Sequence, residues 1–358
     1  MSRPCTSTSG GFVEAQGAGV VVLMSASAAI AYGAPIYGIV GMSGTATDKQ
    51  GRSVPAPGKG ILSSARESPR VTRMLDVSYR RQQFTAQKAA LDQWKSAELQ
   101  AIAGDNDDDL DMATHEIEAT YKRQYQALQD TWGSEFWKRN TDISPLRGSL
   151  AAWGLTADDI GLASFHGTST KANDKNESSV LNTQLKHLGR TPGHVVPAVC
   201  QKWLTGHSKA AAALFMLNGV LQSLRSGLVP GNRNADNIAA ELKQYDYTVF
   251  LSKTIQTTGI KAALIKSFGF GQVGGELLVI HSDYVLAALT QEQLEAYNRQ
   301  LRKRSLKADR YWQDVLIGKH PFVQIKHRPP FTEQQEESVY LDPLARVHFD
   351  PISNSYKF

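Results

Sequence analysis

The stretch from Ala15 to Thr47 contains no charged side chain. A stretch of this length without charge belongs either in the interior of a folded domain or inside a membrane. It is rich in Gly, Ala and Ser, and Pro35 interrupts it, which is not the pattern of a continuous apolar membrane helix. We predict a buried unit of an α/β domain, with a strand over 20–24, a helix over 25–32 and a strand over 35–41.

Composition narrows the class of protein. The chain has 358 residues, 39 Lys plus Arg against 34 Asp plus Glu, and a net charge of +5. These values exclude a disordered chain and a collagen, and so mild a charge makes no case for a nucleic-acid partner. Two cysteines, Cys5 and Cys200, cannot form a disulfide framework, and the first residues lack the pattern of a signal peptide. We therefore expect a cytoplasmic protein.

The chain changes character along its length. A Gly- and Pro-rich loop at 51–60 is followed by a polar segment at 79–137, whose charged residues and apolar spacing favour helices. An acidic break at 104–111 divides that segment into two helices, which predicts a helical hairpin inserted into the α/β domain. The expected organisation has four parts: the end of a first half-domain (1–78), a helical insertion (79–143), a second half-domain (144–288) and a C-terminal extension (289–358).

The α/β pattern returns at Leu150. Small residues at 209–226 predict a helix, and the tail from Thr290 is predicted to be helical before it becomes loop-like near four prolines. Short apolar runs predict the remaining strands, at 163–165, 195–199, 247–251, 262–265 and 277–281.

Three segments combine glycine, hydroxyl and imidazole groups close to predicted strand ends. They are 165–170, followed by Asn173, Asp174 and Glu177; 201–209; and 267–272. His166 and His207 each lie beside a glycine, which is unusual for core histidines. Neutral imidazoles can donate hydrogen bonds to a carbonyl that is becoming an enolate, and a helix N-terminus beside His207 would disfavour its protonation. The pattern indicates decarboxylation or Claisen chemistry.

Weaker patterns point to no further site. The sequence at 269–274 fits G-x-G-x-x-G, but a strand follows it instead of a helix, which argues against a dinucleotide. Acidic positions within 105–116 fit the spacing of a calcium loop, but Leu110 replaces the required glycine, so no metal is predicted. The basic run at 299–310 is interpreted as a solvated helix face, with contact to a carrier protein or nucleic acid as minor alternatives.

Together these motifs resemble the β-ketoacyl-acyl carrier protein synthases of the thiolase fold. The resemblance is carried by His-Gly-Thr-Ser-Thr, Lys-x-x-x-Thr-Gly-His and Ser-Phe-Gly-Phe-Gly, and by residues 2–4 and 11–19. The segments at 51–60, 171–178 and 230–236, with the helical insertion, are similar to the α subunit of fungal type I fatty acid synthase. The resemblance covers essentially the whole chain. It implies an α/β, thiolase-like layered sandwich, of which this chain forms the C-terminal half and the end of the N-terminal half.

The resemblance also assigns roles to residues. His166 and His207 match the two catalytic histidines, Lys202 matches the active-site lysine, and Glu177 matches the acidic residue that would hold the lysine by charge. Phe270 matches a gating aromatic whose backbone N–H helps to form an oxyanion hole. The remaining expected site residues flank these groups: Gly269 and Gly271 beside Phe270, and Asp174, Thr168 and Thr170 as supporting polar residues.

The family nucleophile is a cysteine in the first half of the fold. This chain starts after that point, and neither Cys5 nor Cys200 matches it, so we expect a truncated α subunit without a nucleophile. The resemblance implies no directly bound cofactor, because phosphopantetheine on an acyl carrier protein carries the substrates. The implied partners are the carrier domain, the fatty acid synthase β subunit and further copies of the same domain, with no nucleic acid or membrane.

Two alternatives remain open. One is the α subunit of a specialised synthase that makes a short acyl starter for a polyketide. The other is a non-catalytic piece, or one half of a split enzyme that assembles with a separate first half. The sequence does not predict the length of the acyl chain, because residues outside this chain also line the tunnel.

Overall fold

The computed structural model describes residues 1–49, 56–66, 72–103, 107–232, 234, 237–323, 332–341, 348–350 and 355–357. Parts of the loop at 51–60, of the acidic break at 104–111 and of the motif at 230–236 lie outside these residues. So do Pro329, Pro330, Pro343 and Pro351, the four prolines on which the loop-like prediction for the tail rests. The chain forms two compact units, Met1–Ala31 with Pro35–Glu295 and Tyr32–Ala34 with Ala296–Phe358.

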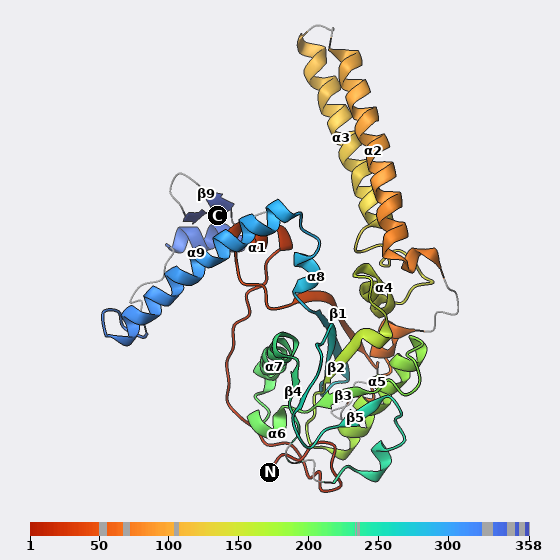
Figure 1. Ribbon diagram of the computed structural model, residues 1–358, viewed down its shortest axis with the longest axis vertical. Coiled ribbons are helices and arrows are strands. Elements are labelled where there is room, and N and C mark those ends of the chain that lie inside the picture. Colours follow the sequence, from red (N-terminus) through yellow and green to blue (C-terminus); the bar gives the residue numbers. More distant parts are fainter. Residues whose placement is uncertain are drawn as a thin grey trace. The chain divides into compact units, whose positions relative to one another are not determined.

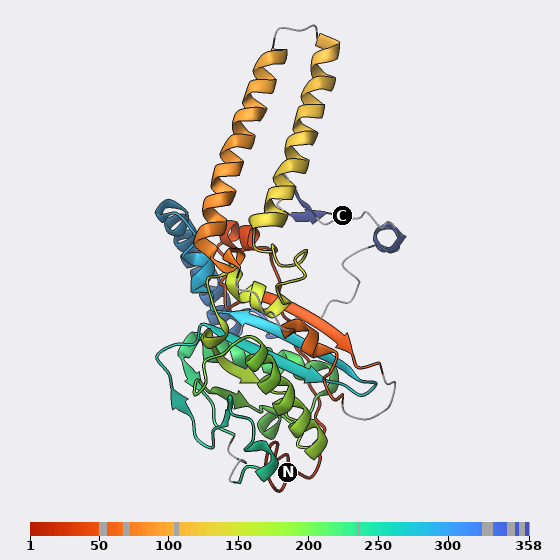
Figure 2. The ribbon, with the colours of Figure 1, turned by 90° about the vertical axis from the view of Figure 1, so that its right-hand side faces the viewer.

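A mixed six-stranded sheet forms the centre of the larger unit (Figures 1 and 2). Its order is β1-β8-β7-β2-β3-β5; β7, β2, β3 and β5 are parallel, whereas β8 is antiparallel to both β1 and β7. The strands are β1 (Ile39–Thr47), β2 (Ile160–Ser164), β3 (Val196–Val199), β5 (Thr248–Phe250), β7 (Ala262–Phe268) and β8 (Val273–Ile280). A short pair, β4 (Leu228–Val229) with β6 (Ile255–Gln256), and a second pair, β9 (His348–Asp350) with β10 (Ser355–Lys357), lie outside this sheet.

Helices cover both faces of the sheet. Along β7, Leu264 belongs to one apolar cluster and Ile265 to another, because successive side chains of a strand point to opposite faces. The first cluster includes side chains of α4 and α5, and the second includes side chains of α7. The helices are α1 (Ala26–Tyr32), α2 (Val77–Ile102), α3 (Asp107–Trp132), α4 (Pro145–Ala152), α5 (Lys171–His187), α6 (Lys202–Thr205), α7 (Ala212–Ser226), α8 (Asp283–Leu286), α9 (Gln291–Leu316) and α10 (Glu333–Leu341). Burial on both faces explains why these strands are continuous apolar runs.

The helical hairpin predicted from the polar segment is present. The helices α2 and α3 run side by side in both views (Figures 1 and 2). Edge-to-face ring contacts join them, Tyr79 with Trp132 and Phe84 with Tyr125. The boundaries of the four expected parts stay predictions.

The predicted strand at 20–24 is wrong. Residues 15–25 form neither helix nor strand, and Val20 is 93% exposed. In the described part of the chain, no strand lies alongside this run, so its backbone has no pairing partner. The predicted helix that follows is confirmed as α1, and the next strand begins at Ile39 instead of Pro35. All five large apolar side chains of this segment, Val20, Val21, Val22, Leu23 and Met24, are left exposed.

The smaller unit contains most of α9, a single helix of 26 residues. The Tyr297 hydroxyl on this helix donates to the Ala34 carbonyl, at 2.9 Å. The tail was expected to be loop-like after α9, but it includes α10. Among the described residues, none of the helices has the length and apolar character needed to cross a membrane.

A buried ion pair links β7 to β8. Lys266 and Glu276 are opposite each other in the antiparallel ladder, and both side chains are fully buried. The Lys266 ammonium also donates to Gln184 Oε1, and the Gln184 amide donates to Glu276 Oε2 at 3.2 Å. Because each group keeps a partner, the charges are tolerated in the core, and they specify one register for the two strands.

We expect Lys266→Met to lower the free energy of unfolding by about 3–5 kcal/mol, because it leaves the Glu276 carboxylate buried without its cation. Denaturant titration of the chain measures this. The double variant Lys266→Met/Glu276→Leu should recover most of the loss. The matched control is Lys88→Met, which removes a solvent-screened pair with Asp92 and should cost far less stability. Equal losses at the two lysines would contradict the interpretation.

Candidate active site

Three parallel strands bring the candidate residues together. In the ladder, Ser164 of β2 pairs with Val199 of β3 and with Ile265 of β7. His166 therefore follows the end of β2 where the chain leaving β3 enters α6, which begins with Lys202. Ligand sites of α/β sheets form at this carboxyl edge of the strands.

The two histidines lie together, as the sequence predicted only by resemblance. Their ring centroids are 5.0 Å apart and the rings are nearly perpendicular, at 88°. The backbone holds His207 against the N-terminal segment: its N–H donates to the Val13 carbonyl at 2.7 Å, and its carbonyl accepts from the Ala15 N–H at 3.0 Å. The Phe12 ring contacts the His207 ring edge-on, with centroids 5.4 Å apart.

Two glycines permit the turns that carry these histidines. Gly167 has a φ of +54°, and a Cβ at this position would lie 2.9 Å from the Cβ of Cys200. Gly206 has a φ of +67°, and a Cβ there would lie 2.8 Å from the Cβ of Ala15. Only glycine combines this backbone conformation with so close an approach.

Both imidazoles are neutral at pH 7. Burial, followed by the charge of Lys202, lowers the pKa of His166 well below its usual value. Burial and the charges of Lys202 and Lys209 lower the pKa of His207 to about 4. The sequence predicted this direction for His207 but attributed it to a helix dipole. In the structure α7 begins only at Ala212, and burial is the largest cause.

Hydrogen bonds select the tautomer of each ring. His207 Nδ1 accepts from the backbone N–H of Lys209, at 3.1 Å. His166 Nδ1 lies 3.3 Å from Lys202 Nζ, and an ammonium group can only donate. In both rings the proton of the neutral imidazole therefore lies on Nε2, which leaves two N–H donors.

Lys202 lies beneath His166 with 2% of its surface exposed. Its ammonium group donates to the His166 carbonyl at 2.5 Å and approaches Met216 Sδ at 3.4 Å. Burial lowers its pKa to about 8, and the charge of Glu177 opposes this shift.

Glu177 does not contact Lys202 directly. Its Oε2 atom is buried and has no hydrogen-bond partner among the described residues. Glu177 Oε1 instead accepts from the Gly167 N–H at 2.9 Å and from the Asn173 amide. Burial raises the pKa of Glu177 to about 8, and the charge of Lys202 opposes this shift. The electrostatic influence on the lysine is therefore exerted at longer range.

The three supporting residues, Asp174, Thr168 and Thr170, form hydrogen bonds with groups other than the histidines. Asp174 Oδ2 accepts from the Cys5 N–H at 2.8 Å and from the Ser9 hydroxyl at 3.0 Å, so it anchors the N-terminal segment. Burial raises the pKa of Asp174 to about 6. The hydroxyls of Thr168 and Thr170 are 3.0 Å apart.

The Gly-Phe-Gly turn connects β7 to β8. The Gly269 N–H donates to the Val273 carbonyl at 2.9 Å, and Gly271 has a φ of +81°. The Phe270 side chain at the tip of this turn is 62% exposed. The structure thus places the predicted gate on a solvent-facing turn beyond the strand ends.

One contact of this site, between Ser267 and His166, does not follow from the sequence. The hydroxyl of Ser267, on β7, lies 3.1 Å from His166 Nδ1. Ser267 is part of the quoted Ser-Phe-Gly-Phe-Gly motif, but only the pairing of β2 with β7 shows which histidine it meets.

Neither cysteine is placed as a nucleophile. Cys5 and Cys200 are both fully buried, and their sulfur atoms are 3.7 Å apart. The hydrogen bond to Cys200, followed by burial, raises the pKa of Cys5 well above its usual value. A reactive thiol needs access and a stabilised thiolate, and Cys5 has neither.

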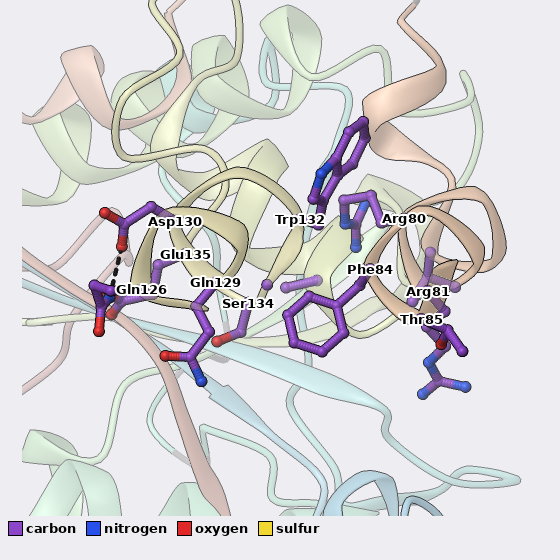
Figure 3. Close-up of a pocket in the computed structure, with 13 residues that line it drawn as sticks. Arg80, Arg81, Phe84, Thr85, Gln126, Gln129, Asp130, Trp132, Ser134 and Glu135 are labelled. Carbon is purple, nitrogen blue, oxygen red and sulfur yellow. Dashed lines mark hydrogen bonds between the residues drawn. The ribbon is translucent and has the colours of Figure 1, made fainter. Parts of the chain in front are cut away.

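The described cavity of about 440 Å³ lies elsewhere, between α2 and α3 (Figure 3). Phe84 and Trp132 supply its aromatic wall, and Gln129 and Ser134 are among its polar lining residues. None of the candidate site residues lines it. The site is therefore identified by the chemical character of its residues and not by the volume of a cavity. Within the described ranges, no group of His, Cys, Asp and Glu could hold a metal ion.

Comparison with known proteins agrees with this geometry. Residues 136–236 match the family described as β-ketoacyl synthase, C-terminal domain. The chain is 48% identical over its whole length to the fatty acid synthase subunit alpha of Saccharomyces cerevisiae. It is 50% identical, over 97% of its length, to that of Schizosaccharomyces pombe. It spans about a fifth of the length of these relatives, 20% in each case.

A solved structure supports the fold. The ketosynthase FabY from P. aeruginosa superposes with a TM-score of 0.57 and 20% identity, over 95% of this chain and 45% of that one. The thiolase-like α/β fold predicted from the sequence is confirmed.

We expect Cys5 and Cys200 to resist iodoacetamide in the folded chain, because both are fully buried. Mass spectrometry after a timed reaction at pH 8 should show no modification, and both sites should react once guanidinium chloride unfolds the chain. Rapid modification of either cysteine in the native state would show that its thiol is accessible after all.

Proposed function

We propose that the chain belongs to the β-ketoacyl synthase family, in the form found in fungal fatty acid synthase α subunits, and that it carries the decarboxylation half of the condensation site. The observation that carries this proposal is the pair of neutral imidazoles. In each ring, Nδ1 faces a hydrogen-bond donor, and the two ring centroids are 5.0 Å apart. The buried ammonium of Lys202 lies beside His166. The reaction condenses an acyl thioester with a malonyl thioester in fatty acid synthesis.

Negative charge develops at two places in this reaction, first on the malonyl thioester oxygen and then on the carbonyl oxygen of the acyl-enzyme. The bond between the malonyl carboxylate and its α-carbon breaks, carbon dioxide leaves, and the electron pair delocalises onto the thioester oxygen as an enolate. The Nε2–H groups of His166 and His207 donate to that oxygen. The enolate carbon then attacks the carbonyl of the acyl-enzyme, whose oxygen accepts from the backbone N–H of Phe270. The thiolate leaves as the new carbon–carbon bond forms.

Lys202 assists without meeting the substrate. Its ammonium keeps His166 Nδ1 as an acceptor and adds a positive charge near the developing enolate. Because Glu177 lies at longer range, it offsets part of the cost of burying that charge without neutralising it by contact. Thr168 and Thr170 support the loop that follows His166, and Asp174 anchors the N-terminal segment that holds His207.

The nucleophile comes from outside this chain, because both of its own thiols are fully buried. The exposed apolar side chains at Val20, Val22, Leu23 and Met24 support an interface with the rest of the ketoacyl synthase fold, since a patch of this kind is rarely left uncovered. The substrates arrive on the phosphopantetheine of an acyl carrier protein domain, with no cofactor bound directly. The assembly includes the β subunit and further copies of this domain, and it is cytoplasmic.

The test is histidine substitution in an α subunit that carries this segment. We expect His166→Ala and His207→Ala each to slow release of carbon dioxide from malonyl thioester by about 10²–10³-fold, while acyl transfer to the nucleophile continues. The double variant should lose less than the product of the two effects, because both groups act on one oxygen. The control His194→Ala removes an exposed histidine near Asp158. Parental release of carbon dioxide by either variant would refute the role assigned to that histidine.

The pKa values predict the pH profile of decarboxylation. His207 titrates at about 4 and His166 below its usual range, so both remain neutral donors from pH 5 to 8. Lys202 titrates at about 8, is charged below that pH and loses its charge above it. The rate should therefore be flat between pH 5 and 7.5 and fall as pH rises through about 8. The Lys202→Met variant should decarboxylate more slowly than the parent, and its rate should not fall near pH 8. If the rate of this variant still falls near pH 8, another group causes the fall.

A further inference from the structure

A second residue reaches the same nitrogen of His166 as Lys202 does. Ser267 Oγ lies 3.1 Å from Nδ1, and Lys202 Nζ lies 3.3 Å from it. The strand register explains the contact: Ser164 pairs with Ile265, so His166 and Ser267, each two residues further on, meet on the same face of the sheet.

The two donors differ in rigidity. Lys202 has a long, flexible side chain, and its ammonium is shared among Nδ1, the His166 carbonyl and Met216 Sδ. Ser267 has one short side-chain torsion and lies on β7, within the ladder to β8. Its neighbour Lys266 forms the buried pair with Glu276 that specifies the register of that ladder. The position of the hydroxyl is therefore set by the sheet itself.

His207 also has a hydrogen-bond donor whose position is fixed. The donor to its Nδ1 is a backbone N–H, that of Lys209, which is as immobile as the chain around it. Without Ser267, His166 would have only a flexible cation at Nδ1. With it, each of the two rings has one donor fixed by the backbone or the sheet.

We propose that Ser267 is a positioning residue: its hydroxyl donates to His166 Nδ1 and holds the ring so that Nε2–H faces the substrate oxygen. The inference rests on the proposed function of His166 and extends it to a residue that does not touch the substrate. A hydrogen bond between neutral groups contributes about 0.5–1.5 kcal/mol, so its loss should slow the decarboxylation step by about threefold to tenfold.

Three variants test the proposal. Ser267→Ala removes the hydroxyl, and Ser267→Thr keeps it. Ser164→Ala is the matched control, since this hydroxyl is buried, lies two residues before His166 and has no hydrogen-bond partner among the described residues. Each is measured in an α subunit carrying this segment, by carbon dioxide release from malonyl thioester. We expect Ser267→Ala to lower kcat by about threefold to tenfold with KM unchanged, and Ser267→Thr and Ser164→Ala to stay within twofold of the parent.

A second measurement does not depend on activity. The ¹⁵N resonances of the His166 ring, identified by their loss in His166→Asn, report which nitrogen carries the proton in the 358-residue chain. The parent should show one form, protonated on Nε2. Ser267→Ala should keep that tautomer, because the Lys202 ammonium can only donate, but its Nδ1 resonance should shift or broaden as the ring loses its fixed donor. Ser267→Thr should restore the parental resonance.

The outcomes separate this proposal from the proposed function. An unchanged Nδ1 resonance in Ser267→Ala, or a loss of kcat that Ser164→Ala matches, overturns the positioning role. If His166→Ala decarboxylates at the parental rate while Ser267→Ala still alters the ring resonances, the positioning contact stands and the proposed function fails. If Ser267→Ala does not fold, the resonances and rate of Ser267→Thr decide: a shifted Nδ1 resonance there, or a kcat more than twofold below that of the parent, contradicts the proposal.

Discussion

The parallel pairing of β2 with β3 and β7 is the constraint on which the rest of the site depends. It ends three chain segments at one edge of the sheet and brings His166, Lys202 and Ser267 together from positions far apart in the sequence. Parallel strands need both faces covered, and α5 and α7 supply that cover. The helices are therefore as necessary to the site as the residues that act in it.

Electrostatics then sets what the assembled groups can do. A buried ammonium beside an imidazole lowers the pKa of that imidazole, because a second positive charge cannot be solvated there. The same ammonium can only donate, so it also determines which ring nitrogen is free of a proton. Burial, and after it this one charge, keep His166 neutral, and the same ammonium orients its donor. Glu177 moderates the cost of that charge from a distance, while its hydrogen bonds hold the Gly167 turn.

Burial also explains why neither cysteine of this chain is accessible as a nucleophile. Cys5 and Cys200 face each other within the core, and neither thiol is accessible to solvent. The apolar run at 20–24 is in the opposite situation, because its composition suits a buried strand and yet it lies exposed without a pairing partner. Both observations support a site completed by protein outside this chain. The length shared with the relatives, a fifth of theirs, is consistent with this proposal.

The sequence by itself determined the fold class, the helical hairpin, most strands of the main sheet and the family. These depend on apolar periodicity and on motifs such as His-Gly-Thr-Ser-Thr, which are local properties of the chain. Tertiary structure alone decided the rest. Whether 20–24 becomes a strand depends on a neighbour, since a strand is stabilised by pairing and not by its composition. The buried pair of Lys266 with Glu276, the longer-range role of Glu177 and the contact of Ser267 with His166 depend on strand register, which joins residues that no local pattern links.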